Sequence, residues 1–283
     1  MIVRGRPSAL GLFFVVRGSL IREVWPQVVG VALLSALVVQ AHRSVPALVP
    51  GVNTAPFALL GIAISIFLSF RNSASYDRWW EGRKLWGQII QTARDIARQS
   101  SMIEGQPERR ALLLAVVAFA RRAERQLRAA PGPESADQAL AEAARQIGAA
   151  ERAGTLTPME ALVLHQSLVR LSQSLVGCER LANTPLPFAY TLLLHRTAYL
   201  FCFVLPFGFA DTIGWGTPLM TALVAYTFFG LDALGAELED PFALLPNGLP
   251  LAAYATTVEI ALRQALGETD LPAPAKPMGF ILT

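Results

Sequence analysis

Few residues of this chain are of the types that catalyse reactions or hold metal ions, and they are scattered. His42, His165 and His195 stand far apart in the sequence and far from Cys178 and Cys202. Neither a glycine-rich phosphate loop nor an H-E-x-x-H zinc motif occurs. The two cysteines form no C-x-x-C pair, so we expect free thiols. These patterns predict a protein that is not an enzyme and that uses no metal and no cofactor.

The stretch Phe57–Gly87 indicates a function other than catalysis. It contains no proline, its first half is apolar, and its second half is charged and aromatic. In a helix, residues four apart stack on one side. Ile62, Ile66 and Phe70 then form one bulky apolar stripe. A ring of such stripes would make a hydrophobic neck, because apolar side chains cannot replace the hydration shell of an ion and a narrow apolar passage closes by dewetting.

A second stripe, of small residues, consists of Gly61, Ser65 and Ser69 and lies roughly 100° around the same helix. Its small-xxx-small spacing lets membrane helices approach closely. The two stripes together favour a ring of identical helices around a narrow apolar hole. The alternative is that both stripes pack in an ordinary membrane core, since most membrane helices carry apolar stripes at this spacing.

Composition favours a membrane protein. Of the 283 residues 53% are hydrophobic and only 16% are charged, and the mean hydropathy is +0.42. The formal net charge of +3 is too small to indicate binding of nucleic acid. The expected surroundings are therefore a lipid bilayer.

Four apolar runs predict transmembrane helices, at Val24–Gln40, Ala55–Phe70, Thr191–Ala210 and Leu219–Leu234. The second run is short against the roughly 20 residues of a lipid-facing helix, which suits a helix that lines a pore walled by protein. An interfacial helix is expected at Ala9–Val16. The long region after Phe70 is rich in arginine, so the positive-inside rule places it, with both termini, on the cytoplasmic side of the inner membrane.

We accordingly divide the chain into four parts. Residues 1–70 carry the interfacial helix and the first two spans, 71–187 form a cytoplasmic helical region, 188–240 carry the third and fourth spans, and 241–283 form a cytoplasmic helix and a loose tail. Within these parts the sequence predicts helices at Ala136–Ala150 and Leu251–Leu266 and a helix opened by the capping box Thr157–Glu160. The fold class is an all-α membrane protein with four transmembrane helices per subunit and a cytoplasmic helical bundle.

Three runs of the sequence resemble landmarks of one family. Arg71–Gly87, which reads RNSASYDRWWEGRKLWG, is similar to the hallmark of bacterial members of the bestrophin family of ion channels. Leu186–Tyr190 and Glu237–Phe242 are similar to the second and third landmarks of that family, in the same order. The resemblance implies a homopentamer around a central pore that conducts monovalent ions.

The resemblance also implies roles for particular residues. The family's neck occupies three positions spaced four apart on the second span, which match the bulky stripe. A second constriction is expected at the cytoplasmic exit, with Leu181 as the candidate and Thr184 as the alternative. The hallmark residues are Arg71, Asn72, Asp77, Arg78, Trp79, Trp80 and Glu81. Of these, the run Asp77–Glu81 is expected to form salt bridges and packing just below the membrane, or else to line a vestibule.

Buried charge and acidic residues complete the expectations. Asp232 lies within an apolar run and should be paired, with Arg196 as a possible partner, and His195 is expected to be a paired structural group rather than a metal ligand. Eukaryotic bestrophins carry a run of acids after the third landmark that binds calcium, whereas here Phe242 is followed by ALLPNG. We therefore expect gating without calcium.

The choice of permeant ion stays open at this stage. Bacterial relatives with this hallmark are associated with monovalent cations, which we favour, and eukaryotic relatives pass anions such as chloride. Two other classes of function compete with a channel: a secondary transporter, which would usually show inverted repeats, and a membrane-anchored signalling scaffold.

Overall fold

The computed structural model describes residues 1–283 except 6, 7, 9, 12–14, 16, 17, 48–50, 131 and 133. Its α-helices are α2 (Ile21–Ser44), α3 (Ala55–Gln99), α4 (Pro107–Leu127), α5 (Ala136–Arg152), α6 (Pro158–Asn183), α7 (Phe188–Ile213), α8 (Thr217–Glu239) and α9 (Leu251–Ala265). Two short 3-10 helices are η1 (Ser100–Ile103) and η2 (Gly214–Gly216). The described residues contain isolated β-bridges but no strand. Most of the interfacial helix expected at Ala9–Val16 lies outside the described residues.

The chain forms two compact units. The first, here named the membrane unit, contains Gly5–Asp77 and Pro185–Glu239. The second, the helical unit, contains Met1–Arg4, Arg78–Thr184 and Asp240–Thr283. The helix α3 contributes to both, which confirms the prediction of one unbroken helix from the apolar run into the charged hallmark.

Three stretches are long and apolar enough to cross a membrane, at Ile21–Ser44, within Ala55–Ile103 and at Phe188–Glu239. The last stretch contains two α-helices, because α7 ends at Ile213 and η2 leads into α8. Gly214 has a φ of +59°, a conformation that glycine adopts without steric cost. The sharp turn between α7 and α8 therefore depends on this residue.

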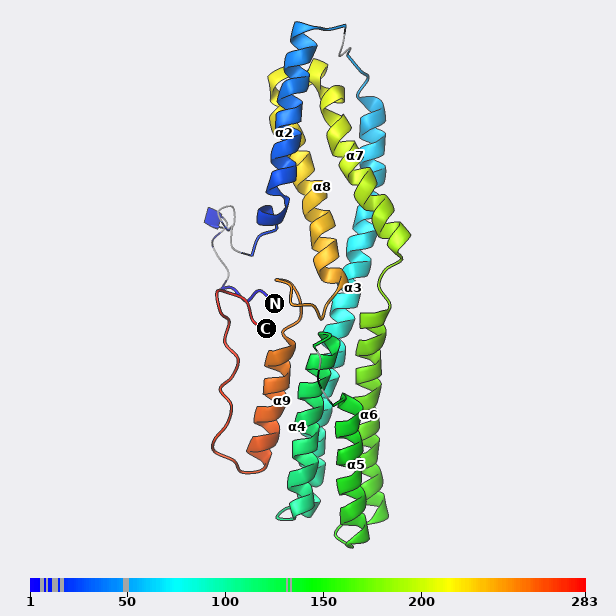
Figure 1. Ribbon diagram of the computed structural model, residues 1–283, viewed down its shortest axis with the longest axis vertical. Helices are drawn as coiled ribbons and strands as arrows, with labels where there is room; N and C mark the ends of the chain where they lie inside the picture. Colours follow the sequence, from blue (N-terminus) through cyan, green and yellow to red (C-terminus); the bar gives the residue numbers. More distant parts are fainter. Residues whose placement is uncertain are drawn as a thin grey trace. The chain divides into compact units, whose positions relative to one another are not determined.

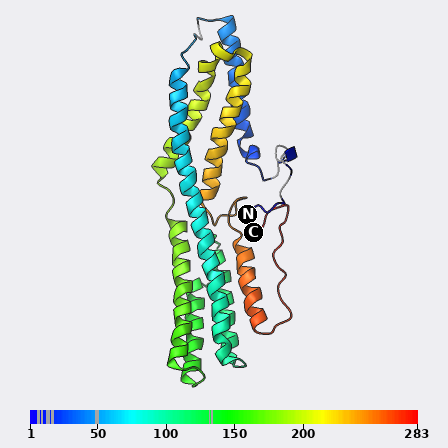
Figure 2. The same ribbon diagram turned by 180° about the vertical axis from the view of Figure 1, so that it is seen from behind.

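The membrane unit packs α2, α7, α8 and the first part of α3 against one another (Figure 1, Figure 2). The hydroxyl groups of Ser35 on α2 and Thr221 on α8 lie 2.6 Å apart in a hydrogen bond that is fully buried. A side chain at Gly208 of α7 would come within 2.8 Å of the ring of Phe57 on α3, so α3 and α7 approach closely only because this position is glycine. Close approach and interhelical hydrogen bonds are the means by which membrane helices associate.

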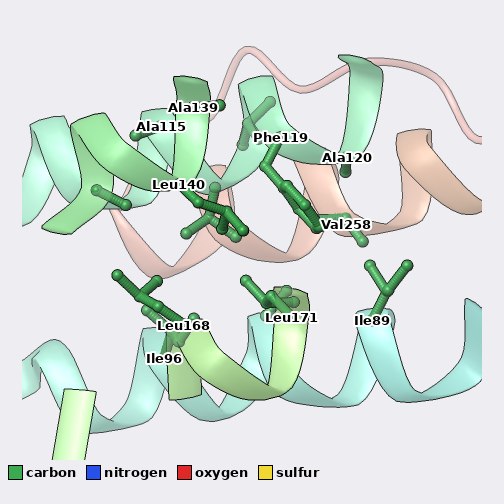
Figure 3. Packing of buried hydrophobic residues seen from close by; sticks show 14 of the residues in the cluster. Ile89, Ile96, Ala115, Phe119, Ala120, Ala139, Leu140, Leu168, Leu171 and Val258 are labelled. Atoms are coloured by element: carbon green, nitrogen blue, oxygen red, sulfur yellow. The ribbon is translucent and has the colours of Figure 1, made fainter. Parts of the chain in front are cut away.

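The helical unit has the core of a water-soluble bundle. Side chains from the second part of α3 and from α4, α5, α6 and α9 interlock, among them Ile89, Phe119, Leu140, Leu171 and Val258 (Figure 3). The predicted helices of this region are confirmed with shifts of one or two residues at their ends. At the N-terminus of α6 the predicted capping box is present, since the Thr157 hydroxyl accepts from the Glu160 N–H and the Glu160 carboxylate accepts from the Thr157 N–H.

The two ends of the chain meet in the helical unit (Figure 1). The Met1 amino group donates to the Leu282 carbonyl at 2.6 Å, and the Leu282 N–H donates to the Met1 carbonyl at 2.8 Å. The Val3 N–H donates to the Phe280 carbonyl at 2.8 Å. Both termini are therefore on the same unit as the region 78–184.

Candidate pore helix and its charged anchor

The first part of α3 has two opposite faces. Ile64 and Leu68 are buried in the core of the membrane unit. On the far side of the helix the bulky stripe points outward, with Ile62 exposed by 59%, Ile66 by 50% and Phe70 by 62%. The spacing of four produces this separation, because positions 62, 66 and 70 fall within an arc of roughly 80° while 64 and 68 lie on the opposite side. Within one subunit the stripe is thus a continuous apolar surface with no partner in its own core.

The small-residue stripe divides between two environments. Gly61 faces α7, where an added side chain would come within 3.1 Å of the Phe201 ring. Ser65 and Ser69 are exposed, and the Ser65 hydroxyl donates to the carbonyl of Gly61 at 2.7 Å, so its polarity is satisfied within the helix.

Two grooves of the membrane unit follow the small-residue stripe along α3. One has a volume of about 530 Å³ and is lined by Gly61 and Ser65 together with Phe228 of α8. The other, of about 490 Å³, is lined by Ser69 and Ser65 with Leu231 of α8. Their walls combine small and apolar side chains, which is the type of surface that accepts another membrane helix.

Directly after the bulky stripe lies a buried charge cluster. Arg71 of α3 is only 2% exposed, and its Nη1 donates to Oδ1 of Asp232 on α8 at 2.5 Å. The other oxygen of Asp232, Oδ2, lies 2.7 Å from Nδ1 of His195 on α7. Nη2 of Arg71 also reaches Oε2 of Glu239 at 3.5 Å. Polar and charged side chains of α3, α7 and α8 therefore contact one another in a single cluster.

This cluster corrects one sequence prediction and confirms another. Arg196 was the predicted partner of Asp232, but its side chain is exposed and the carboxylate is held by Arg71 and His195 instead. His195 is a paired structural group, as expected. The described residues contain no group of three or more His, Cys, Asp or Glu side chains that could hold a metal ion.

The next part of the hallmark makes contacts within the helical unit. The Arg78 guanidinium donates to the Leu181 carbonyl at 2.7 Å and to the Thr184 carbonyl at 2.5 Å, and so satisfies the C-terminal end of α6. Trp79 Nε1 donates to the Asn247 carbonyl at 2.9 Å. These hydrogen bonds give Arg78 and Trp79 roles in fastening α3 to neighbouring segments.

Other hallmark residues differ in their exposure. Glu81 pairs with Arg180 of α6 at 2.6 Å on the surface of the helical unit. Trp80 stacks on Trp79 with ring centroids 6.4 Å apart and stays half exposed. Asp77 is exposed, and Asn72 donates to the carbonyl of Leu68 within α3.

The two residues proposed for a second constriction have opposite environments. Leu181 is 5% exposed, and its side chain packs in the core of the helical unit of its own subunit. Thr184, the residue after the last turn of α6, is exposed. The preference for Leu181 over Thr184 is therefore not supported by the packing of this end of α6.

The comparisons with known proteins identify the class to which this fold and this helix belong. The family described as bacterial and fungal bestrophin protein matches residues 1–143 and 131–264. The chain therefore belongs to the bestrophin family, and the resemblance of its three landmark runs is confirmed.

Relatives and solved structures agree with this assignment. A protein of Mesorhizobium japonicum named a voltage-dependent anion channel-forming protein is 45% identical, covering 96% of each chain. A protein of Escherichia coli K12 with the same kind of name is 36% identical, covering 98% of each chain. A crystal structure of a bacterial bestrophin homologue from Klebsiella pneumoniae superposes with a TM-score of 0.81 at 36% identity, covering 85% of this chain and 97% of that one. Membership of this family points to a membrane channel rather than an enzyme.

Proposed function

We propose that the chain forms a homopentameric channel for monovalent ions in the inner membrane, with the first part of α3 from five copies surrounding the pore. The observation that carries this proposal is the outward-facing stripe of Ile62, Ile66 and Phe70 on the side of α3 opposite its own core. Family membership and the channel names of the relatives support it. The small-residue grooves beside the stripe give a neighbouring copy a place to pack.

In this assembly the three side chains form stacked apolar rings, the hydrophobic neck. Ions cannot exchange their hydration shell for hydrocarbon, so the neck blocks conduction by dewetting until the rings move apart. Successive rings are separated by about 6 Å along the axis, four residues at 1.5 Å each. The neck is thus a gate of three layers.

The proposed topology has four transmembrane helices, α2, the first part of α3, α7 and α8, in the parts 1–70 and 188–240. The regions 71–187 and 241–283 lie in the cytoplasm together with both termini. The arginine enrichment of the region after Phe70 supports the cytoplasmic side for that region. The pairing of Met1 with Leu282 inside the helical unit supports the same side for both termini.

For selectivity we propose a preference for cations, set by a ring of Asp77 carboxylates. Seven residues after Phe70, Asp77 falls on the same side of α3 as the neck and is exposed. Rings of acidic side chains are a usual means of attracting cations to a pore. Anion selectivity is the second candidate, favoured by the names of the relatives.

Two finer features belong to the same proposal. Thr184, fastened through its carbonyl to Arg78, is our candidate for the cytoplasmic constriction. Gating is independent of calcium, because no acidic run follows Phe242. Titration of calcium in bilayer recordings tests the second point: the open probability should stay constant, and a steep response at micromolar calcium would contradict it.

Recording from the purified full chain in planar bilayers tests the channel itself. Discrete unitary currents are expected, whereas uptake of tracer ions without unitary steps would indicate a transporter, and neither activity would favour a scaffold. Ile66→Ala removes one layer of the neck and should raise the open probability or the conductance. Leu60→Ala is the matched control, because Leu60 loses the same number of atoms, is also exposed, and lies roughly 120° away from Ile66 around α3.

A reversal potential measured under a gradient of KCl decides the selectivity. The Asp77 ring predicts a shift toward the potassium equilibrium potential that Asp77→Asn reduces. Lys84→Gln is the comparison of opposite sign: it removes a positive charge from the same side of α3 about two turns further along, and it should not reduce the shift. A reversal potential at the chloride equilibrium value would support the second candidate instead.

A further inference from the structure

The charge cluster of the membrane unit lies directly next to the proposed gate. Arg71 follows Phe70, the last neck residue, in the same helix, and its guanidinium is almost fully buried. Nη1 of Arg71 bonds both to Oδ1 of Asp232 at 2.5 Å and to the Asp232 main-chain carbonyl at 3.3 Å. A change in the hydrogen bonds between Arg71 and Asp232 therefore affects the residue next to Phe70, at the end of the neck.

Asp232 is shared between two basic groups. Its Oδ1 accepts from Arg71, and its Oδ2 lies 2.7 Å from Nδ1 of His195. Histidine is the side chain that ordinarily gains or loses its charge between about pH 5 and 8. The same carboxylate thus faces one permanent cation and one cation that depends on pH.

We propose that Arg71, Asp232 and His195 form a proton-sensitive latch that positions Phe70 at the cytoplasmic end of the neck. With His195 neutral, Asp232 is balanced by Arg71, and this ion pair holds α3 against α8. When His195 takes up a proton, two cations flank one carboxylate, and the repulsion between them weakens the bond from Asp232 to Arg71. The Arg71 side chain then turns toward Glu239, the carboxylate already 3.5 Å from its Nη2.

The side chain of His195 is not enclosed by the membrane unit. Its side chain is 49% exposed and borders a cavity of about 390 Å³ in the membrane unit. From α2 the polar groups at this cavity are Glu23 and Gln27, and from α7, besides His195, they are Thr191 and Tyr199. The ring centroid of Tyr199 lies 4.3 Å from that of His195.

Arg71 from α3 and Asp232 from α8 complete the charged groups of the cavity. Arg196, the next residue of α7, is exposed. His195, the titratable residue of the latch, is therefore half exposed beside the cavity. Arg71, its permanent cation, is almost fully buried.

The proposal rests on the proposed channel function and makes a specific prediction. Lowering the pH on the cytoplasmic side from 8 to 5.5 should raise the open probability roughly fivefold, the effect of weakening one charge-assisted hydrogen bond. The unitary conductance should change little, because the latch moves the gate and does not line the pore. The experiment is a set of single-channel recordings from the purified full chain in planar bilayers of fixed salt concentration.

Neutral replacements of His195 remove the pH-sensitive charge. His195→Gln and His195→Asn each keep a group that can hydrogen-bond to Asp232, and with either the open probability should be flat between pH 8 and 5.5. The matched controls are His42→Gln and His165→Gln, which change the two other histidines of the chain and should respond to pH as the wild type does.

The possible results separate the latch from the channel. Unitary currents whose open probability does not depend on pH, or a His195→Gln or His195→Asn protein that keeps the response, would overturn the latch and leave the channel intact. Loss of the response in His42→Gln or His165→Gln would also overturn it. If the wild type gives no unitary currents at any pH, the channel proposal fails and the latch fails with it.

Discussion

The membrane unit and the helical unit are both made of packed helices, but they distribute side chains in opposite ways. The membrane unit exposes many large apolar residues, among them Leu33, Leu37, Leu59, Leu200, Leu219 and Leu223. It buries charge, since Arg71 and Asp232 pair in its interior. The helical unit has the larger buried apolar core and keeps ion pairs such as Arg110–Glu268 and Arg145–Glu142 at its surface.

The difference follows from the solvent for which each unit is built. In water, removal of apolar surface supplies most of the stabilisation, so the helical unit needs a dense apolar core. In lipid, hydrocarbon contacts are equally available outside the protein, so helices associate through close approach and buried polar pairs. Gly208 against Phe57, Ser35 with Thr221, and the Arg71 cluster serve this purpose in the membrane unit.

The largest contrast is expected from deleting a phenylalanine in each unit. Phe119 on α4 is fully buried in the core of the helical unit (Figure 3). Phe119→Ala should lower the free energy of unfolding by about 4 kcal/mol, through lost burial and the cavity left behind. Phe203→Ala on α7 should cost less than about 1 kcal/mol, since the side chain is 40% exposed and its ring contact is with Tyr199, at 6.5 Å between centroids. Thermal unfolding of the detergent-solubilised protein measures both, and equal losses would contradict the assignment of two different environments.

Removal of a charged group should destabilise the membrane unit more than the helical unit. Asp232→Asn leaves the Arg71 guanidinium buried without its closest counter-charge, and we expect a loss of about 3 kcal/mol. Asp95→Asn breaks the pair with Arg98, which is exposed to solvent on α3 in the helical unit, and should cost at most about 0.5 kcal/mol. The same unfolding assay applies. If both substitutions cost the same, the Arg71 cluster does not stabilise the membrane unit.

The contrast also explains which features the sequence could predict. Helix positions followed from local patterns: the unbroken apolar-to-charged run of α3 and the Thr157–Glu160 box at the start of α6. Exposure of the bulky stripe followed from its spacing of four, because Ile64 and Leu68 occupy the opposite side.

Partners distant in the sequence were harder to predict. Asp232 could be recognised as a residue that needs a counter-charge, but 161 residues separate it from Arg71 and several arginines were candidates. Arg196 was named as a possible partner, but its side chain is exposed, and Arg71 and His195 hold the carboxylate. Leu181 shows a related difficulty, since an apolar residue at the end of a helix suits both a constriction and a core, and here it packs in the core of the helical unit.

A smaller effect is expected at the start of α6. Thr157→Ala removes the hydroxyl that accepts from the Glu160 N–H and should lower the free energy of unfolding by about 1 kcal/mol. Thr257→Ala is the control, because the Thr257 hydroxyl donates only to the Ala253 carbonyl one turn earlier within α9. If the two substitutions had equal effects, capping would not contribute to the helical unit as proposed.

At Cys178 on α6 we expect the smallest change in stability, but chemical labelling of this residue gives a clear signal. Its thiol is fully buried, and burial raises its pKa to about 12, with the nearby carboxylates of Glu179 and Glu81 adding to the shift. The thiolate is the reactive form, so at pH 8 the folded protein should react with a maleimide roughly a thousandfold more slowly than the unfolded chain. The pKa of the Cys178 thiol is higher in the folded protein than in the unfolded chain. The contribution of this difference to the free energy of unfolding is therefore complete below the ordinary thiol pKa, and it is lost as the pH rises from about 9 to 12. Labelling of a Cys202→Ala protein isolates this thiol, and rapid labelling at pH 8 without unfolding would show that the core around Cys178 opens freely.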